Sequence, residues 1–143
     1  MKQIYRILYC SLNTLHGSTE QQSVEVEKIL ASSRRNNARN EITGALLFNS
    51  GHWAQVLEGP PAAVEQTFEK IQQDMRHSEI SVLECGLVPN RDFPSWSMAH
   101  AVSNQVAEPA FEFLNLPNAL HNPTSAGAAI GALLRTLVTQ DEI

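Results

Sequence analysis

The stretch that decides the fold is NNARNEITGALLFNSGHWAQVLEGPPAAVE, residues 36–65. It begins at the end of one expected helix and finishes at the start of another. The apolar runs Ile42–Phe48 and His52–Leu57 read as strands, and the Asn-Ser-Gly sequence between them at 49–51 is typical of a tight turn. The stretch therefore predicts a β-hairpin placed between two helices.

One polar side chain interrupts the apolar face of the second hairpin strand. Side chains alternate between the two faces of a strand, so Trp53, Gln55 and Leu57 share a face. If that face packs on the core, the Gln55 amide needs partners, because a buried unpaired amide costs roughly 1–3 kcal/mol. The residues alone leave two readings open, a structural amide bonded to a neighbour or a buried water, and an amide that serves a ligand.

The pattern around the hairpin predicts an α+β fold of ferredoxin-like type. Its β-α-β-β-α-β order, followed by one more strand, places two helices on one face of an antiparallel-rich sheet. The expected elements are, in chain order, a strand Ile4–Ser11, a helix over about 21–35 that ends near Asn36-Asn37, the hairpin, a helix beginning at Gly59-Pro60-Pro61 with the apolar stripe Val64, Phe68, Ile71 and Met75, a strand Ile80–Val88 and a strand Ser95–Ala101.

The remaining residues predict a helical tail. Glu108–Leu116 and Ser125–Val138 read as helices, and the second has an Ala/Gly-rich first half that allows close packing. We therefore divide the chain into a domain over 1–101 and a C-terminal extension over 102–143 that packs on the sheet or in an oligomer interface.

Composition restricts the class of protein. The chain has 143 residues, 43% of them hydrophobic, and a net charge of −5, which fits one acidic globular domain and argues against nucleic-acid binding. No apolar run approaches the roughly 20 residues of a membrane span, and no signal peptide is evident. Cys10 and Cys85 read as reduced core cysteines of a cytoplasmic protein, and the five histidines lack metal-ligand spacing.

Several polar side chains are expected to converge beneath the two helices. Adjacent first and third strands would make Tyr9 and Gln55 neighbours, while Ser33 and Asn37 end the core-facing stripe of the first helix. Such groups suit a planar heterocycle rich in carbonyls and ring nitrogens, with Ile29 and Ile71 as apolar walls. Lys70, Asp74 and His77 lie on an adjacent helical stripe, which on its own reads as a solvated charged edge.

A series of motifs resembles one known family. They are, in chain order, Tyr9 followed by Ser11, NNAR at 36–39, ITGALL at 42–47, QVLEG at 55–59, IQQDMRH at 71–77 and WSM at 96–98. Each is weak alone, but all of them in this order over residues 4–101 closely resemble the BLUF family of blue-light sensors that use FAD.

The resemblance implies non-covalent FAD between the helices. Tyr9 would then donate an electron and a proton to the excited flavin, and the Gln55 amide would rearrange and change its bond to the flavin C4 carbonyl and N5. Trp96 and Met98 would carry the signal out. The expected cofactor-binding set is Tyr9, Ile29, Ser33, Asn37, Gln55, Lys70, Ile71, Asp74 and His77.

The resemblance also assigns places around the flavin. Asn37 would bind the C4 carbonyl and N3 edge, Lys70 would lie near the C2 carbonyl, and Asp74 and His77 would lie near the ribityl–phosphate side. The loop Leu12–Ser23 is a few residues longer than is common in the family. No metal site is expected.

The chain is expected to bind and switch rather than to catalyse. With no effector following its tail, it resembles short family members that signal through a separate protein, and we expect a homo-oligomer without nucleic-acid or membrane partners. The alternatives are a ferredoxin-like regulatory module that binds a small ligand and an acylphosphatase-like hydrolase, although the loop after the first strand lacks the glycine and arginine pattern of an anion site.

Overall fold

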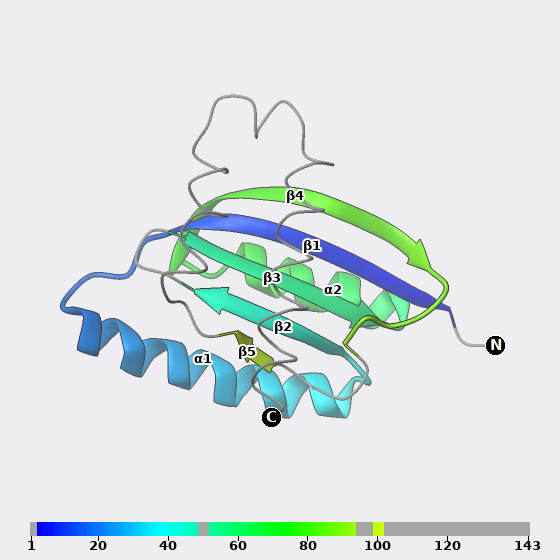
Figure 1. Cartoon of the computed structure of the whole chain (residues 1–143), viewed down its shortest axis with the longest axis horizontal. Coiled ribbons are helices and arrows are strands. Elements are labelled where there is room, and N and C mark those ends of the chain that lie inside the picture. Colours follow the sequence, from blue (N-terminus) through cyan, green and yellow to red (C-terminus); the bar gives the residue numbers. More distant parts are fainter. Residues whose placement is uncertain (1–2, 49–51, 94–98, 102–143) are drawn as a thin grey trace.

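Two helices cover one face of a five-stranded sheet (Figure 1). The computed structural model describes residues 3–48, 52–93 and 99–101. The elements are β1 (Ile4–Asn13), α1 (Thr19–Arg39), β2 (Thr43–Phe48), β3 (His52–Gly59), α2 (Pro61–Gln72), β4 (His77–Val88) and β5 (Ala99–Ala101). This order confirms the predicted α+β ferredoxin-like arrangement.

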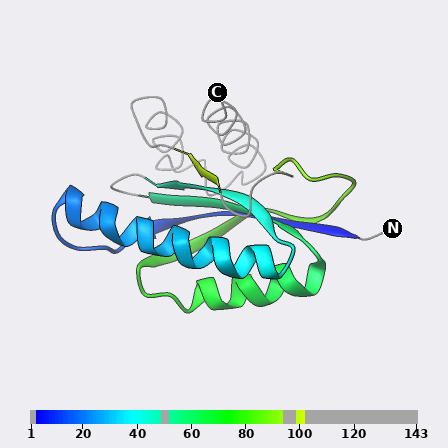
Figure 2. The same cartoon turned by 90° about the horizontal axis from the view of Figure 1, so that it is seen from below.

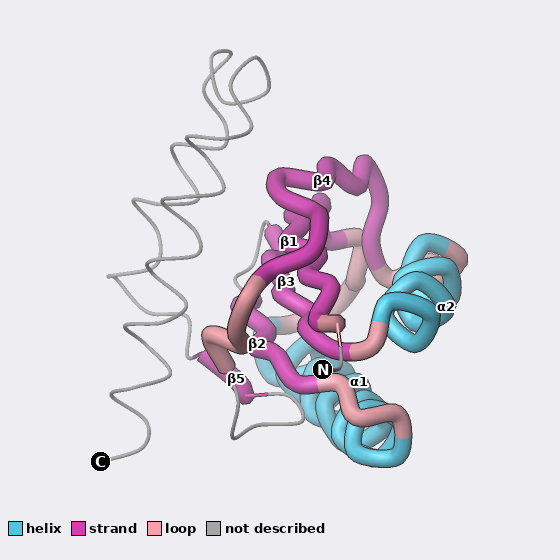
Figure 3. Tube along the Cα trace, turned by 90° about the vertical axis from the view of Figure 1, so that its right-hand side faces the viewer, coloured by secondary structure: helices cyan, strands magenta, loops and turns pink. Residues whose placement is uncertain are grey.

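The strand order of the sheet is β4-β1-β3-β2-β5. Neighbouring strands are antiparallel except for β2 and β5, which are parallel. Both helices lie on the same side of the sheet, as the turned views show (Figures 2 and 3). The predicted adjacency of the first and third strands is therefore correct, and the register places Tyr9 opposite Gln55.

The core lies between the sheet and the helices. It contains the Trp53 and Leu57 side chains of β3, as expected from the alternation of that strand. The predicted stripe of α1 is also confirmed, since Val26 and Leu30 are buried and Ile29 packs against the same cluster. In α2, Val64 is fully buried, whereas Met75 is 90% exposed and lies beyond the helix. Including Met75 in the apolar stripe was wrong.

The first helix is longer than the sequence predicts. Ser18 caps it with a full capping box, in which the Ser18 hydroxyl accepts from the Gln21 backbone and the Gln21 side chain accepts from the Ser18 backbone. The helix continues past the expected end near Asn36-Asn37 to Arg39. The helix does not end at an asparagine in the left-handed conformation, as the sequence predicts. Asn40, which follows the helix, has a φ of −101°, and the next residue, Glu41, has the left-handed φ of 60°.

Other boundaries shift because strand pairing continues further than the apolar runs. β3 extends to Gly59, which pairs with Tyr5, and β1 extends to Asn13, which pairs with His77. β4 consequently starts at His77 rather than at Ile80. Cys10 is buried as expected, but Cys85 is exposed on this edge strand and is not a core residue.

Part of what the sequence predicts lies outside the described residues. This holds for the hairpin turn at 49–51, for Trp96 and Met98, and for the tail over 102–143 with its two expected helices. Only Ala99–Ala101 of the expected fifth strand is described, and it is a strand. Neither of the described helices is long and apolar enough to cross a membrane.

Candidate functional site

A cavity of about 190 Å³ lies between the two helices and the sheet. Its floor comes from β1, β2 and β3, its sides from α1 and α2, and its far end from the segment that joins α2 to β4. The lining residues are Tyr9, Ile29, Ser32, Ser33, Asn36, Asn37, Asn40, Leu46, Trp53, Gln55, Leu57, Thr67, Lys70, Ile71, Asp74, Arg76 and His77. All nine residues that the sequence suggested for cofactor binding are among them.

The Tyr9 phenol and the Gln55 amide are hydrogen-bonded on the cavity floor. The Tyr9 hydroxyl donates to Gln55 Oε1, and both residues are buried, at 3% and 5% exposure. They meet because β1 and β3 pair with these two residues opposite each other. Burial raises the pKa of Tyr9, and the negative charge of Asp74 raises it further. The phenol therefore keeps its proton at neutral pH and directs it at the amide oxygen.

Aromatic contacts fix the orientation of the phenol. The Phe68 ring of α2 packs on the Tyr9 ring with centroids 5.4 Å apart, and the His77 imidazole lies edge-on at 6.2 Å. A ring held from two sides cannot turn away from Gln55 without losing both contacts.

His77 connects three parts of the site. Its Nδ1 lies 2.7 Å from the Ser11 hydroxyl and its Nε2 lies 2.7 Å from the Ile71 carbonyl oxygen. Because a carbonyl only accepts, Nε2 carries the proton. His77 is the first residue of β4, so placing it on a stripe of the second helix was wrong. It nevertheless reaches the same cavity as Lys70 and Asp74.

A charged pair lies at the end of the cavity beyond α2. The Arg76 guanidinium donates to both Asp74 carboxylate oxygens, with Nε 2.9 Å from Oδ1, and these hydrogen bonds hold the pKa of Asp74 below its usual range. Arg76 also lies 3.9 Å from a Glu25 carboxylate oxygen on α1. Lys70 also lines this end of the cavity, so the rim carries cations and carboxylates side by side. Asp74 follows the end of α2 and is not part of the helix.

The last turns of α1 supply the opposite side of the cavity. Asn37 is 2% exposed, and its backbone carbonyl accepts from Asn40 and Ile42, which fixes where the helix ends above the sheet. Ser33 is half-buried one turn earlier, as the stripe predicted. Ile29 of α1 and Ile71 of α2 face the cavity as its apolar sides.

Sequence reasoning missed several lining residues. Arg76 is one of them, although the motif IQQDMRH places it one residue before His77. Trp53 was identified only as a core residue. Its indole Nε1–H is buried without a hydrogen-bond partner among the described residues, which a strand pattern cannot reveal.

A buried ionic cluster occupies the opposite face of β3. The Glu58 carboxylate is fully buried and accepts from Arg6 Nε at 2.8 Å and from the backbone N–H groups of Asp92 and Phe93 at 2.9 Å each. Arg91 donates to the Glu58 carbonyl oxygen at 2.9 Å. This cluster ties the chain after β4 to the strand that carries Gln55.

Comparison with known proteins identifies relatives of this arrangement. The sequence pattern of a family described as "BLUF: Sensors of blue-light using FAD" matches residues 4–99. The "Blue light- and temperature-regulated antirepressor BluF" of Escherichia coli (strain K12) is 36% identical over 78 residues, which are 54% of this chain and 19% of that protein. The "Photoactivated adenylate cyclase subunit beta" of Euglena gracilis is 33% identical over 85 residues, 59% of this chain and 10% of that protein.

Solved structures of similar length match over most of the chain. The structure described as "BlrB - a BLUF protein, dark state structure" has a TM-score of 0.72 and 28% identity, and covers 99% of this chain and 98% of that one. "BlsA ground state" has a TM-score of 0.75 and 29% identity, and covers 92% and 87%.

Proposed function

This chain belongs to the BLUF family of blue-light sensors that use FAD, and we propose that its light signal originates in the hydrogen bond between Tyr9 and Gln55. That buried bond on the floor of the cavity is the observation that carries the proposal. The family match over residues 4–99 favours this function over the two alternatives, a regulatory module that binds a small ligand and an acylphosphatase-like hydrolase.

The cavity residues fit the flavin part of FAD. An isoalloxazine ring has flat apolar faces and a polar edge, and the cavity sets Ile29 and Ile71 on its sides and the Gln55 and Asn37 amides at its inner surface. Lys70 at the rim offers N–H donors to the carbonyl oxygens of the ring. The apolar faces and the polar edge of the flavin ring are thus both matched by residues of one cavity.

We assign the photochemical roles to the chain as follows. FAD held by these residues would supply the absorption of blue light and an acceptor for one electron. Tyr9 would give up that electron together with its hydroxyl proton, which would leave through the existing hydrogen bond to Gln55 Oε1, and both would return to Tyr9 before the switched state is complete, so that the phenol and the amide end in their neutral forms. The Gln55 amide then rearranges, so that its donor and acceptor groups face different partners.

The surrounding residues hold this pair and the cofactor. Asn37 binds the polar edge of the ring from the end of α1, with Ser33 beside it. Lys70 lies near the C2 carbonyl of the flavin, and Asp74 lies near the ribityl–phosphate side. The Arg76 guanidinium holds Asp74 in place by donating to both of its carboxylate oxygens. His77 lies at the far end of the cavity, on the ribityl–phosphate side of the cofactor. There it already connects β1 to the end of α2.

The output route leads to a separate protein. We propose that Trp96 and Met98 carry the signal from the cavity to the surface and that residues 102–143 form an interface with a second subunit or an effector. The chain spans only 19% and 10% of the two curated relatives above, so their outputs do not define its own.

The proposed function is tested by loading the protein with FAD and recording its absorption before and after blue light. We expect a yellow protein whose flavin bands shift reversibly to longer wavelength. Asn37→Leu, which replaces the amide by an apolar group branched at the same carbon, should weaken FAD binding at least tenfold in equilibrium dialysis. A protein that takes up no flavin would end the proposal.

A further inference from the structure

The Trp53 indole lines the cavity with a buried N–H group whose hydrogen-bond acceptor is missing from the described part of the chain. It is 4% exposed, and its Nε1–H is the buried side-chain polar group that lacks a hydrogen-bond partner within ranges 3–48 and 52–93. An indole N–H can only donate, and native proteins rarely leave such a donor unpaired. The Phe48 ring packs against it with centroids 4.4 Å apart, so the indole is held in place.

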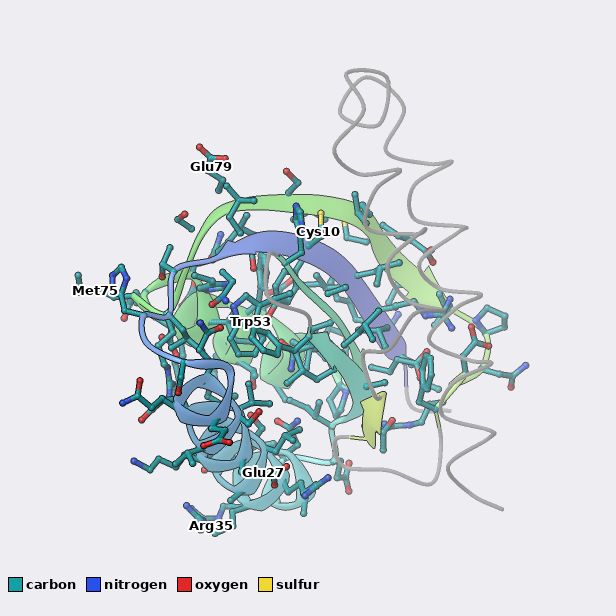
Figure 4. The ribbon with its side chains drawn as sticks, turned by 60° about the vertical axis from the view of Figure 1, so that its left-hand side comes forward. Cys10, Glu27, Arg35, Trp53, Met75 and Glu79 are labelled. Carbon is teal, nitrogen blue, oxygen red and sulfur yellow. The ribbon has the colours of Figure 1, made fainter. Side chains whose placement is uncertain are left out.

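The position of Trp53 relates it directly to Gln55. The two residues are two positions apart on β3, so their side chains share a face and start roughly 7 Å apart, within reach of long side chains. Both line the cavity. Trp53 lies in the interior between the sheet and α1, whereas Cys10 projects on the other side of the sheet (Figure 4).

The acceptor that Trp53 lacks becomes available if the Gln55 amide turns. In the present structure Gln55 Oε1 accepts from the Tyr9 hydroxyl. When the amide rearranges, this oxygen leaves the phenol and needs another donor. We propose that the Trp53 Nε1–H donates to Gln55 Oε1 in the illuminated state and so positions the turned amide. This inference rests on the proposed function, and it makes Trp53 a positioning residue.

Trp53→Phe tests the inference because it removes the N–H and keeps an aromatic ring. We expect FAD binding and the light-induced shift to persist, while recovery in the dark becomes about fivefold faster, as expected for the loss of one net hydrogen bond. Phe48→Leu is the matched control, since it alters the packing of the indole and leaves its N–H. Equal acceleration in Phe48→Leu would overturn the hydrogen-bond explanation.

A direct readout comes from the indole proton. The chain has two tryptophans, so ¹⁵N-tryptophan labelling gives two indole signals, and the one absent from Trp53→Phe belongs to Trp53. We expect its proton signal to move downfield on illumination of the FAD-loaded protein and to return in the dark.

Three other outcomes would contradict the inference in different ways. If the Trp53 indole signal does not move while the flavin absorption shifts, the hydrogen bond from Trp53 to Gln55 is rejected and the proposed function stays intact. A signal that moves when FAD binds in the dark, and not on illumination, would show that the N–H bonds the cofactor instead. A protein that shows no flavin shift at all would remove the proposed function, and this inference with it.

Discussion

At the scale of single residues, the site depends on a phenol that is both buried and hydrogen-bonded. Burial raises the pKa of Tyr9, so its proton is retained over the whole physiological range. The same proton is directed at Gln55 Oε1, so the proposed proton movement follows a hydrogen bond that already exists in the folded protein. An exposed tyrosine would offer its proton to water instead.

The raised pKa of Tyr9 has a measurable effect on stability. Above about pH 10 the unfolded chain loses the phenol proton while the folded chain keeps it, so the unfolded state binds fewer protons and stability falls as pH rises. We expect the free energy of unfolding to fall more steeply above pH 10 in the wild type than in Tyr9→Phe, by on the order of 1 kcal/mol per pH unit. Urea unfolding of both proteins between pH 8 and 11 measures this difference, and parallel curves would contradict it.

Gln55→Leu separates the amide from the phenol. The change keeps a side chain of similar size on the cavity floor and leaves the Tyr9 hydroxyl without its acceptor. We expect FAD to bind, the dark flavin spectrum to differ from that of the wild type, and light to produce no further shift. A dark spectrum identical to that of the wild type would show that the amide does not contact the flavin.

At the scale of elements, β3 is the link between the two faces of the sheet. Its cavity face carries Gln55, and its opposite face carries Glu58, which holds the backbone of Asp92 and Phe93. Arg6 balances this carboxylate. Burial lowers the pKa of Arg6, but the hydrogen bond and charge of Glu58, together with the hydrogen bond to Glu84 and the charge of Asp92, raise it above its usual value. The ionic cluster therefore fixes the start of the connection from β4 towards β5.

Arg6→Met tests the contribution of this cluster. The change leaves a fully buried carboxylate without its cation, and removing one partner of a buried ion pair costs roughly 3–5 kcal/mol. We expect a loss of about 3 kcal/mol in the free energy of unfolding measured with urea. The double change Arg6→Met with Glu58→Gln should recover part of that loss, because the unpaired charge is gone. A neutral effect of Arg6→Met alone would contradict a structural role for the pair.

At the scale of the whole molecule, we expect light sensing and signal output to depend on different residues. Trp96→Ala and Met98→Ala should leave FAD binding and the flavin shift largely intact and should weaken light-dependent capture of a partner. Pull-downs from the source cell, in light and in darkness, with absorption spectra of the same samples, measure both properties. Complete loss of the flavin shift in either variant would place that residue in the photochemical core instead.

The sequence was sufficient to predict how the helices and strands are arranged and which residues line most of the cavity. Alternation in β1 and β3 and the stripe of α1 brought Tyr9, Gln55 and Asn37 together, because period-2 and period-3.6 patterns report which face is buried. Element ends were less predictable. α1 continued through two asparagines, and α2 stopped before Asp74, because tertiary contacts and turn geometry decide where a helix ends.

Interactions between distant segments were the part that sequence could not supply. The bond of His77 to Ser11, the approach of Arg76 to Glu25 and the Glu58 cluster all depend on side-chain geometry after folding. The unpaired Trp53 N–H belongs to the same class, since only the packed core shows whether a donor has found an acceptor.

The most direct test of the account is a light-minus-dark absorption spectrum of FAD-loaded Tyr9→Phe beside that of the wild type. Only one hydroxyl is removed, so the fold should lose roughly 0.5–1.5 kcal/mol and FAD should still bind. Phenylalanine cannot supply the electron and the proton, so the account predicts a reversible red shift in the wild type and a flat difference spectrum in Tyr9→Phe. A normal, reversible red shift in Tyr9→Phe would contradict the central role of the Tyr9–Gln55 hydrogen bond.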